Sequence, residues 1–356
     1  MNIREFAKLC GVAPTTVSRA LNRPLEKAEV SRQVYERIHA KAQEIGFHVN
    51  YHAKALFSAK SNTIGCIAGG PMNVLCGFFV ESIMPTLTSH GKSFFMYPCS
   101  GDLKLEAKAF ELMLYNKVEA IIHIPALQED PSRGSGHIDA VLKKYPHRPP
   151  IVSVYGGALF DNCYQIRVPE YQTGRQAALR QLACGCRKFG IVKAQLTNLY
   201  SQELIRGYRE TLLECGVPPE EIREVILQNP IQPGAYEPFR GVDGIWCCYH
   251  IMLVLTCRHL QEVCDLSKLQ VDTIFAYELE WFYKDLLPCT ATTESPRNFL
   301  CWFGGLVIHK FHLHDLGRRA AEIALKLCDA PDMSPQTEYI DLIPETFEYG
   351  NKPKKE

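Results

Sequence analysis

The stretch GVAPTTVSRALN, residues 11–22, gathers several hydrogen-bonding side chains near the start of the chain. The guanidinium of Arg19 can donate two parallel hydrogen bonds, a pattern that matches guanine O6 and N7 in a DNA major groove. The methyl group of Thr15 and the ring of Pro14 can pack against a thymine methyl. A hydroxyl such as that of Thr16 can donate to a phosphate oxygen. Together these residue types favour duplex DNA as the partner of this stretch.

Three short helices are predicted to position these side chains. The apolar residues within 3–10 repeat at helical spacing, and Gly11 suits the positive φ of a turn that ends this first helix. Pro14 can begin a second helix because the first turn does not need its N–H. Ser31 is a good N-cap for a third helix, which we expect to stop at Gly46. Two helices joined by a tight turn and closed by a third predict a helix-turn-helix unit, whose second helix enters the major groove.

Charge separates this head from the rest of the chain. The 356 residues carry no net charge, but residues 1–62 hold ten Lys and Arg against five Glu, a net charge of +5, which leaves −5 for the remainder. A basic head on an acidic body suggests a polyanion bound at one end only. On charge alone, a solvated basic face without a ligand is the alternative.

The composition is that of a globular protein, with 46% hydrophobic and 22% charged residues. No apolar run approaches the roughly 18 residues that a membrane span requires. The first residues lack the apolar segment of a secretory signal, so we expect a cytoplasmic protein without a membrane partner. The 15 cysteines are scattered and odd in number, and in a reducing compartment they serve as small apolar residues.

The head resembles the DNA-binding region of the lactose-repressor/galactose-repressor (LacI/GalR) family. The resemblance runs without a gap over residues 3–67 and rests on IREFAKLCGVAPTTVSRALN, VSRQVYERIHAKAQEIGFHVN and AKALFSAKSNTIGCI. It implies that Pro14, Thr15 and Arg19 read bases. It implies contacts to the DNA backbone, or bracing of the helix, for Thr16, Ser18 and Asn22. Ala13 departs from the family, which usually has a Ser or Thr cap there.

Residues 50–59 resemble the family's hinge helix, which orders when two copies meet on DNA. Leu56 matches the residue that wedges into the minor groove, and Ala53 and Lys54 lie beside it in the sequence. So short a helix is marginal in isolation. Val49 replaces the common proline before this segment. The alternative is a plain linker with Leu56 packed on the body.

Beyond Thr63, strand-like and helix-like stretches alternate. The expected strands of the first half are TIGCIAGG, KSFFMYPC, VEAIIHIPAL and PIVSVYG, with helices at 78–89 and at LEAKAFELMLYN. The second half is predicted to contain helices at 172–183 and 202–215 and strands at 188–193, 244–248 and 272–276. Such alternation implies parallel sheets with helices on both faces. Two such halves fit the two-lobed, periplasmic-binding-protein-like body of the same family.

The predicted fold class is therefore a small all-α helix-turn-helix head plus an α/β two-lobed body. We place the DNA-binding domain at residues 1–48, the hinge or linker at 49–61, and the effector-binding and dimerisation body at 62–350. Lobe 1 would comprise about 62–160 and 300–316, and lobe 2 about 161–290 and 317–345.

The resemblance implies an effector site between the lobes, outside the carboxyl ends of the strands. Several sugar-contacting positions depart from the family pattern, namely Pro169-Glu170, Leu204, Tyr249-His250 and Glu278. By position, the candidate effector contacts are Phe79, Glu170, Tyr249, His250 and Glu278, each of which could equally be a packing or surface residue. Aromatic, acidic and imidazole groups would favour a polyol, an amine-bearing sugar or another polar molecule over a sugar phosphate.

Other chemistry has weaker support. HKFHLHD brings His309, His312 and His314 together, and on a strand the last two would share a face that could bind zinc with a cysteine. No paired CxxC supports a metal, and there is no GxSxG, P-loop or GxGxxG, so we expect neither an enzyme nor a cofactor. Residues 289–305 form an insertion relative to the family, which could cover the cleft, extend a dimer surface or simply pack.

We therefore expect a homodimeric, sequence-specific regulator of transcription, in the first instance a repressor. Each head would read a half-site of a near-palindromic operator, and a small molecule such as a sugar or polyol would change the orientation of the lobes. One alternative is the same regulator without a small-molecule effector, suggested by the altered cleft positions. A solute-binding protein is another, against which the head and the missing signal peptide argue.

Overall fold

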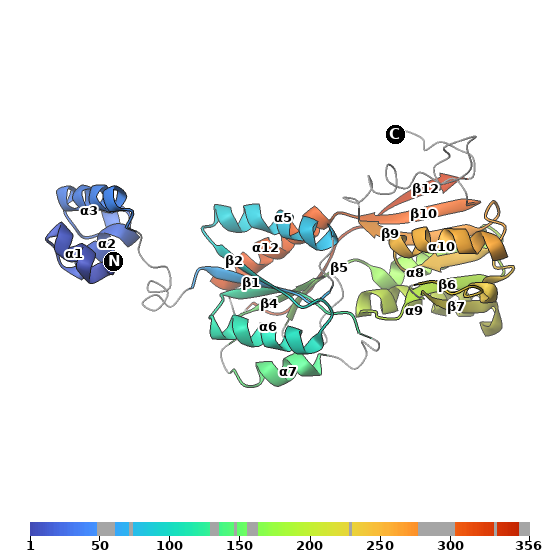
Figure 1. Cartoon of the computed structure of the whole chain (residues 1–356). Coiled ribbons are helices and arrows are strands. Elements are labelled where there is room, and N and C mark those ends of the chain that lie inside the picture. The colour runs from blue at the N-terminus through green and yellow to red at the C-terminus, as the bar shows by residue number, and fades with distance from the viewer. Residues whose placement is uncertain are drawn as a thin grey trace. The chain divides into compact units, whose positions relative to one another are not determined.

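A computed structural model of the chain describes residues 1–47, 61–70, 74–128, 135–145, 148–154, 163–227, 230–276, 303–330 and 333–348 (Figure 1). The chain divides into two compact units, Met1–Ser61 and Asn62–Glu356. The division falls where the sequence places the start of the body. Within the described ranges, no helix is both long and apolar enough to cross a membrane.

The head consists of α1 (Ile3–Cys10), α2 (Pro14–Asn22), the 3₁₀ turn η1 (Leu25–Lys27) and α3 (Arg32–Ile45). The expected ends are confirmed, because Gly11 and Gly46 both adopt the left-handed conformation, each with φ +63°. Ser31 caps α3 by accepting a hydrogen bond from the Val34 N–H. The apolar faces of the three helices bury a core of Phe6, Ala7, Cys10, Val17, Ala20, Ile38, Ala42 and Phe47.

The first sheet of the body is entirely parallel, with strand order β11-β5-β4-β3-β1-β2. Its strands are β1 (Thr63–Ala68), β2 (Ser93–Pro98), β3 (Ala120–Ile124), β4 (Ile151–Val154), β5 (Cys163–Arg167) and β11 (Thr337–Tyr339). One face is covered by α5 (Val74–Ser89) and α12 (Leu313–Asp329), and the other by α6 (Leu103–Tyr115) and α7 (Gly136–Leu142) (Figure 1).

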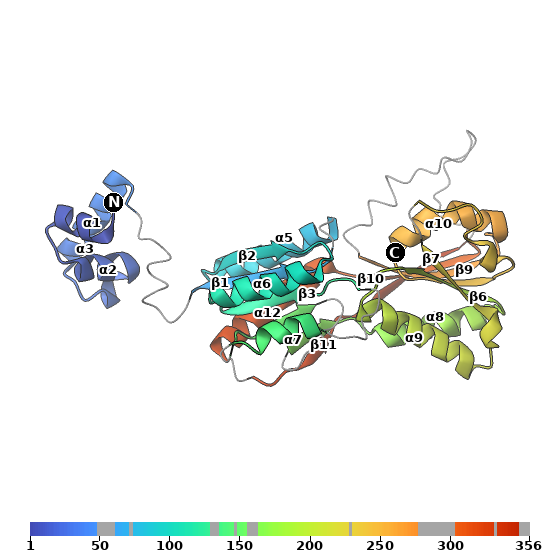
Figure 2. The ribbon, with the colours of Figure 1, turned by 60° about the horizontal axis from the view of Figure 1, so that its bottom comes forward.

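The second sheet has strand order β12-β10-β9-β8-β6-β7 and is parallel except for β12, which runs antiparallel to β10. Its strands are β6 (Phe189–Ala194), β7 (Ile222–Leu227), β8 (Gly244–Cys247), β9 (Gln270–Ala276), β10 (Gly305–Phe311) and β12 (Ile343–Glu348). Helices α8 (Glu170–Ala183) and α9 (Leu199–Glu214) cover one face, and α10 (His250–Val263) covers the other (Figure 2). The predicted fold class is confirmed: a helical head followed by two α/β lobes.

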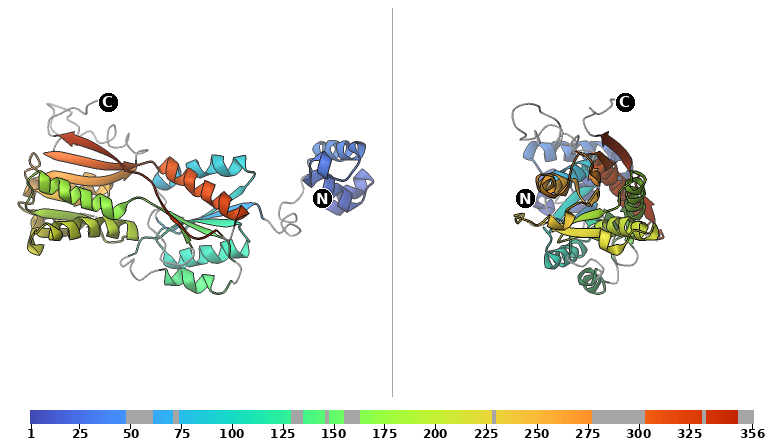
Figure 3. Two further views of the ribbon diagram at one scale, coloured as in Figure 1. Left: turned by 180° about the vertical axis from the view of Figure 1, so that it is seen from behind. Right: turned by 90° about the vertical axis from the view of Figure 1, so that its right-hand side faces the viewer.

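Two C-terminal segments belong to the other lobe than the one predicted from the sequence, whereas β12, whose first residues fall in the segment assigned to lobe 2, does lie in the second sheet. β10, within the segment assigned to lobe 1 (300–316), lies in the second sheet, whereas most of α12 and all of β11, assigned to lobe 2 (317–345), pack on or join the first sheet (Figure 3). β5 also joins the first sheet, so the chain passes to lobe 2 after Arg167 rather than near residue 160. An apolar strand pattern predicts a buried strand, but it does not say which sheet the strand joins.

The strand on which His312 and His314 would share a face does not extend to these residues. β10 ends at Phe311, His312 is the N-cap residue of α12 and His314 lies inside that helix, so these two residues do not share a strand face. The apolar residues from Leu313 onward repeat at helical spacing and pack against the first sheet, which favours the helix. Among the described residues, no group of three His, Cys, Asp or Glu side chains could hold a metal ion.

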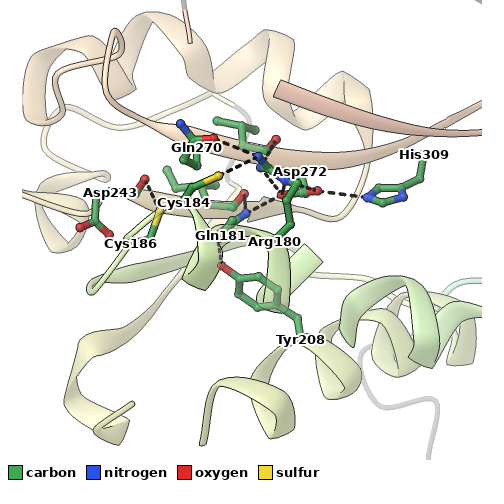
Figure 4. A network of polar contacts seen from close by, with 11 residues as sticks. Arg180, Gln181, Cys184, Cys186, Tyr208, Asp243, Gln270, Asp272 and His309 are labelled. Carbon is green, nitrogen blue, oxygen red and sulfur yellow. Dashed lines mark hydrogen bonds and ion pairs between the residues drawn. The ribbon is translucent and has the colours of Figure 1, made fainter. Parts of the chain in front are cut away.

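A buried polar cluster anchors α8 to the second sheet (Figure 4). The Asp272 carboxylate on β9 accepts hydrogen bonds from the Arg180 guanidinium at 2.5–3.2 Å, from Gln181 Nε2 at 2.8 Å and from His309 Nε2 at 3.1 Å. Tyr208 on α9 donates to Gln181 Oε1 at 2.6 Å, which ties the outer helix to the same cluster. The cluster therefore links two helices and two strands of one lobe.

Candidate DNA-binding interface and effector region

Helix α2 presents a mixed surface suited to a groove. Pro14, Thr15 and Arg19 are exposed, while Val17 and Ala20 are fully buried in the core of the head. This division follows the helical period, since residues three or four apart share a face. The three predicted base readers therefore lie on the accessible side of the helix.

The residues predicted to contact the DNA backbone or to brace the helix are half-buried. These residues are Thr16, Ser18 and Asn22. Asn22 Nδ2 donates to Ser18 Oγ at 3.4 Å, one helical turn away, which is a bracing contact. The helix starts at Pro14 without a side-chain cap from Ala13, as its sequence predicts.

The buried side of α2 is held by contacts to α3. His39 Nε2 lies 3.0 Å from the Ala20 carbonyl oxygen, and the His39 ring lies 4.3 Å from that of Tyr35. Phe6 and Phe47 stack with ring centroids 4.0 Å apart, closing the core from α1 to the end of α3. The exposed face of α2 therefore belongs to a helix that is held in place by its contacts within the head. The predicted hinge contacts Ala53, Lys54 and Leu56 lie outside the described residues.

The predicted effector contact Phe79 packs inside lobe 1. Its side chain is 3% exposed within the apolar core, and its carbonyl oxygen accepts a hydrogen bond from Ser82 Oγ at 2.6 Å. A Cβ on Gly317 would lie 2.7 Å from the same carbonyl oxygen, so α5 and α12 are in close contact there. Phe79 is therefore a core residue of the α5–α12 pair.

Glu170 begins α8 and is 3% exposed. Arg167 Nε donates to both of its carboxylate oxygens, at 3.1 and 3.2 Å. Burial raises the pKa of the Glu170 carboxyl, although the nearby Arg167 charge opposes the rise. The Glu170 carboxylate is therefore paired with Arg167 at the point where the chain enters the second lobe.

Tyr249 is the N-cap residue of α10 and follows the carboxyl end of β8. Its hydroxyl donates to Asn198 Oδ1 at 3.4 Å, and its ring stacks on Tyr200 with centroids 6.3 Å apart. Asn198 follows β6 and caps α9, so Tyr249 and Asn198 lie together at the carboxyl edge of the second sheet. The side chain of His250 and all of Glu278 lie outside the described residues, as do residues 289–302 of the insertion.

Among the described residues, segments that follow the carboxyl ends of β3 and β6 pair with each other. Gln128, which follows β3, and Thr197, which follows β6, exchange two backbone hydrogen bonds of 2.7 Å each. In parallel α/β sheets, ligands bind outside these strand ends. The edges that carry Asn198, Tyr249 and the segment after β3 therefore have the position of ligand sites in this class of fold.

A buried glutamate with two histidines lies beside this edge in lobe 1. Glu106 on α6 is 1% exposed and accepts hydrogen bonds from His123 Nε2 at 2.8 Å, His137 Nε2 at 2.7 Å and the Ala126 N–H at 2.9 Å. Burial raises its pKa, but these hydrogen bonds and the charge of His123 outweigh it and hold the pKa at about 2. The cluster joins α6 and α7 to the end of β3.

We predict a pH-dependent contribution of Glu106 to stability. Since its folded pKa is about 2, against an ordinary 4.5, the carboxylate stabilises the fold above pH 4.5 and loses this effect as the pH falls toward 2. The stability difference between the wild type and Glu106→Gln should shrink by about 1 kcal/mol between pH 5 and pH 3.5. Urea unfolding at each pH measures it, with the exposed Glu81→Gln as control. A difference that does not change with pH would contradict the paired carboxylate.

The sequence interpretation missed Glu106, Asn198 and Asp272. One signal was available for Glu106, because Ala109, Phe110 and Met113 follow it at helical spacing and are all buried, so it occupies a core position. Asp272 likewise interrupts the apolar strand QVDTIFA. A charged residue at a core position predicts a buried partner, but the sequence does not identify that partner.

Comparisons with known proteins agree on one family. Residues 2–50 match the family of bacterial regulatory proteins called the lacI family. The HTH-type transcriptional regulator DegA of Bacillus subtilis (strain 168) is 24% identical over 243 residues, which are 68% of this chain and 69% of DegA.

Solved structures share the fold. The crystal structure of the Lac repressor dimer bound to operator and the anti-inducer ONPF has a TM-score of 0.72 at 15% identity, over 97% of both chains. A LacI-family transcriptional regulator from Enterococcus faecium with bound ribose has a TM-score of 0.60 at 13% identity, over 82% of this chain and 100% of that one. The resemblance seen in the sequence is thus confirmed: the head matches the lacI family of bacterial regulatory proteins, and the chain shares its fold with LacI-family transcriptional regulators along nearly its whole length.

Proposed function

We propose that the protein is a homodimeric repressor whose heads each read a half-site of a near-palindromic operator. The carrying observation is the exposed Arg19 on a helix whose opposite face is buried in the core of a basic head. An exposed Arg on the second helix of a helix-turn-helix can donate to guanine O6 and N7. Pro14 and Thr15 are exposed at the start of the same helix and contact neighbouring bases in this proposal.

The hinge completes DNA binding in this proposal. Leu56, flanked by Ala53 and Lys54, enters the minor groove at the centre of the operator when two chains meet there. An inserted apolar side chain unstacks a base step and bends the duplex. The operator is therefore expected to have a deformable step at its centre.

A small polar molecule, such as a sugar or polyol, is proposed to bind between the lobes and control operator affinity. Its site is supported by the carboxyl strand ends that carry Asn198 and Tyr249 and by the ribose bound in the Enterococcus faecium neighbour. Such a ligand acts only through a difference in its affinity for the two lobe arrangements.

A regulator without a small-molecule effector is a second candidate. It is favoured because two of the candidate effector contacts have partners within the protein: Phe79 is packed in the core, and Glu170 is ion-paired with Arg167. Thermal unfolding of the full chain with a panel of sugars and polyols separates the two. A rise in Tm with one compound supports the effector, because a ligand of the folded state stabilises it. Unchanged Tm across the panel, with operator binding retained, supports the second candidate.

The DNA-binding proposal is tested by selection from a random duplex pool at stated, near-physiological salt, because nonspecific affinity depends steeply on salt. A near-palindrome with a deformable central step is the expected product. If no motif is recovered, with or without added metabolites, the proposed sequence-specific reading is wrong.

Arg19→Ala should weaken binding to the selected operator by about 1–3 kcal/mol and change binding to random DNA much less. The reason is that a bidentate contact to guanine discriminates between bases, whereas a phosphate contact does not. Fluorescence anisotropy on both duplexes at the same salt measures the effect. An equal loss of affinity on both duplexes would indicate that Arg19 contacts only phosphates.

A further inference from the structure

The carboxylate of Glu29 lies close to the C-terminal end of α2, the helix that carries the proposed base readers. Its Oε2 is 3.2 Å from Arg19 Nη1, and its Oε1 is 3.9 Å from Arg23 Nη1. Arg23 Nη1 also lies 3.5 Å from the Lys27 carbonyl oxygen. One anionic side chain is thus shared by the two arginines on the last turn of α2 and just beyond it.

The backbone of Glu29 adopts a conformation that is unfavourable for a residue other than glycine. It has a φ of +53°, in the left-handed region that disfavours a residue with a Cβ by about 1–2 kcal/mol. The preceding residue, Ala28, is fully buried. A glycine would relieve the backbone, yet it would lack the carboxylate that reaches Arg19.

The charge of Glu29 opposes simple attraction to DNA. The head carries a net positive charge, and each added cation near phosphate strengthens binding to any sequence. A carboxylate beside Arg19 is repelled by phosphates and competes with them for the guanidinium. Glu29 therefore weakens contacts between Arg19 and the DNA backbone.

The same contact leaves Arg19 able to read a base. A guanidinium has five N–H donors in a fixed plane, so a carboxylate at Nη1 leaves the Nε and Nη2 edge for two parallel hydrogen bonds. The pair is exposed, with 49% of the Arg19 side chain and 64% of the Glu29 side chain accessible, and in water such a pair contributes little. Its effect grows where a bound duplex excludes water.

We propose that Glu29 is a specificity-determining residue of the head, which rests on the proposed role of Arg19 as a base reader. Its carboxylate holds the Arg19 guanidinium in the orientation for a guanine edge and disfavours its contact with phosphate. Loss of the carboxylate releases Arg19 to bind any duplex.

The test compares Glu29→Gln with Glu26→Gln, which removes the same charge from the exposed η1. Affinities are measured on the duplex selected by the wild type and on a scrambled duplex of equal length, over a salt series. Both variants should bind the scrambled duplex more tightly. Only Glu29→Gln should lower the ratio of specific to nonspecific affinity, roughly five- to tenfold. Glu29→Gly, which suits the positive φ and keeps the turn, should lower the ratio similarly.

An equal rise on both duplexes for Glu29→Gln and Glu26→Gln would overturn the proposal, since only general electrostatics would remain. The double variant Arg19→Ala/Glu29→Gln separates this failure from that of the proposed function. If Glu29 acts through Arg19, the loss of specificity caused by Glu29→Gln should vanish in the Arg19→Ala background. A loss that persists there overturns the positioning role. No motif in the wild-type selection, or an Arg19→Ala variant that loses affinity equally on both duplexes, overturns the base-reading role and this inference with it.

Discussion

Replacing Asp272 by alanine is expected to lower the free energy of unfolding of the body by about 3–5 kcal/mol. The carboxylate is fully buried and accepts hydrogen bonds from Arg180, Gln181 and His309 (Figure 4). Its removal leaves the guanidinium of Arg180, whose side chain is only 25% exposed, without its anion. Breaking a buried pair by removing one partner costs far more than the pair contributes, because an uncompensated charge remains.

The contacts that survive do not replace the carboxylate. Gln181 keeps its hydrogen bond to the Ile245 carbonyl oxygen, and Arg180 keeps those to Gln270 and the Val271 carbonyl oxygen. These acceptors are neutral, so they do not compensate the charge of the Arg180 guanidinium. Asp272→Asn, which retains one acceptor oxygen but not the charge, should therefore lie between the wild type and Asp272→Ala.

Urea unfolding followed by tryptophan fluorescence measures this loss, because Trp246 is fully buried with its ring 6.1 Å from that of His309. The matched control is Asp265→Ala, which removes an exposed carboxylate 3.2 Å from Lys268 Nζ and should cost no more than about 1 kcal/mol. The m-value should be unchanged, so that the midpoint reports stability alone. Equal losses for the two variants would argue against an intact buried cluster.

Gly207→Ala is expected to destabilise the second lobe by about 3 kcal/mol or more. Gly207 on α9 and Gly174 on α8 bring the backbones of the two helices into direct contact. A Cβ on Gly207 would lie 2.0 Å from the Tyr171 carbonyl oxygen, and one on Gly174 would lie 2.0 Å from the Leu204 carbonyl oxygen. A backbone atom cannot rotate aside as a flexible side chain can, so the helices must separate.

Separation would affect the residues that the two helices bury together, including Ala177 on α8 and Tyr208 on α9. In an open helix the same substitution would stabilise, because alanine is favoured over glycine by about 0.5–1 kcal/mol. Gly77→Ala on α5 supplies this control, since a Cβ there meets no atom within 4 Å. Opposite signs for the two variants, measured by thermal unfolding, are the expected result.

A second substitution tests whether the two glycines form one contact. Once Gly207→Ala has separated the helices, Gly174→Ala should cost less than it does alone, so the double variant should be less destabilised than the sum of the single variants. Simple additivity would show that each glycine meets its neighbour independently.

The head was largely predictable because its structure depends on residues close in sequence. Gly11, Pro14 and Ser31 act on the helix ends beside them, and these ends lie where the sequence placed them. The helical period alone separated the exposed Arg19 from the buried Val17 and Ala20. In the body, the same reasoning left open whether Phe79 is a contact or a packing residue, and its side chain lies in the core.

What the sequence alone determined is the class of the elements that it predicted, the parallel α/β organisation of the body and the family that the head matches. These follow from local periodicity, helix capping and a continuous motif. Only the tertiary structure decided which sheet receives β10, that α12 returns to the first lobe, and that Asp272 meets Arg180, 92 positions earlier in the chain. The physical reason is that strand pairing and buried charge pairing depend on groups far apart in sequence, and an apolar run or an isolated charge carries no information about its distant partner.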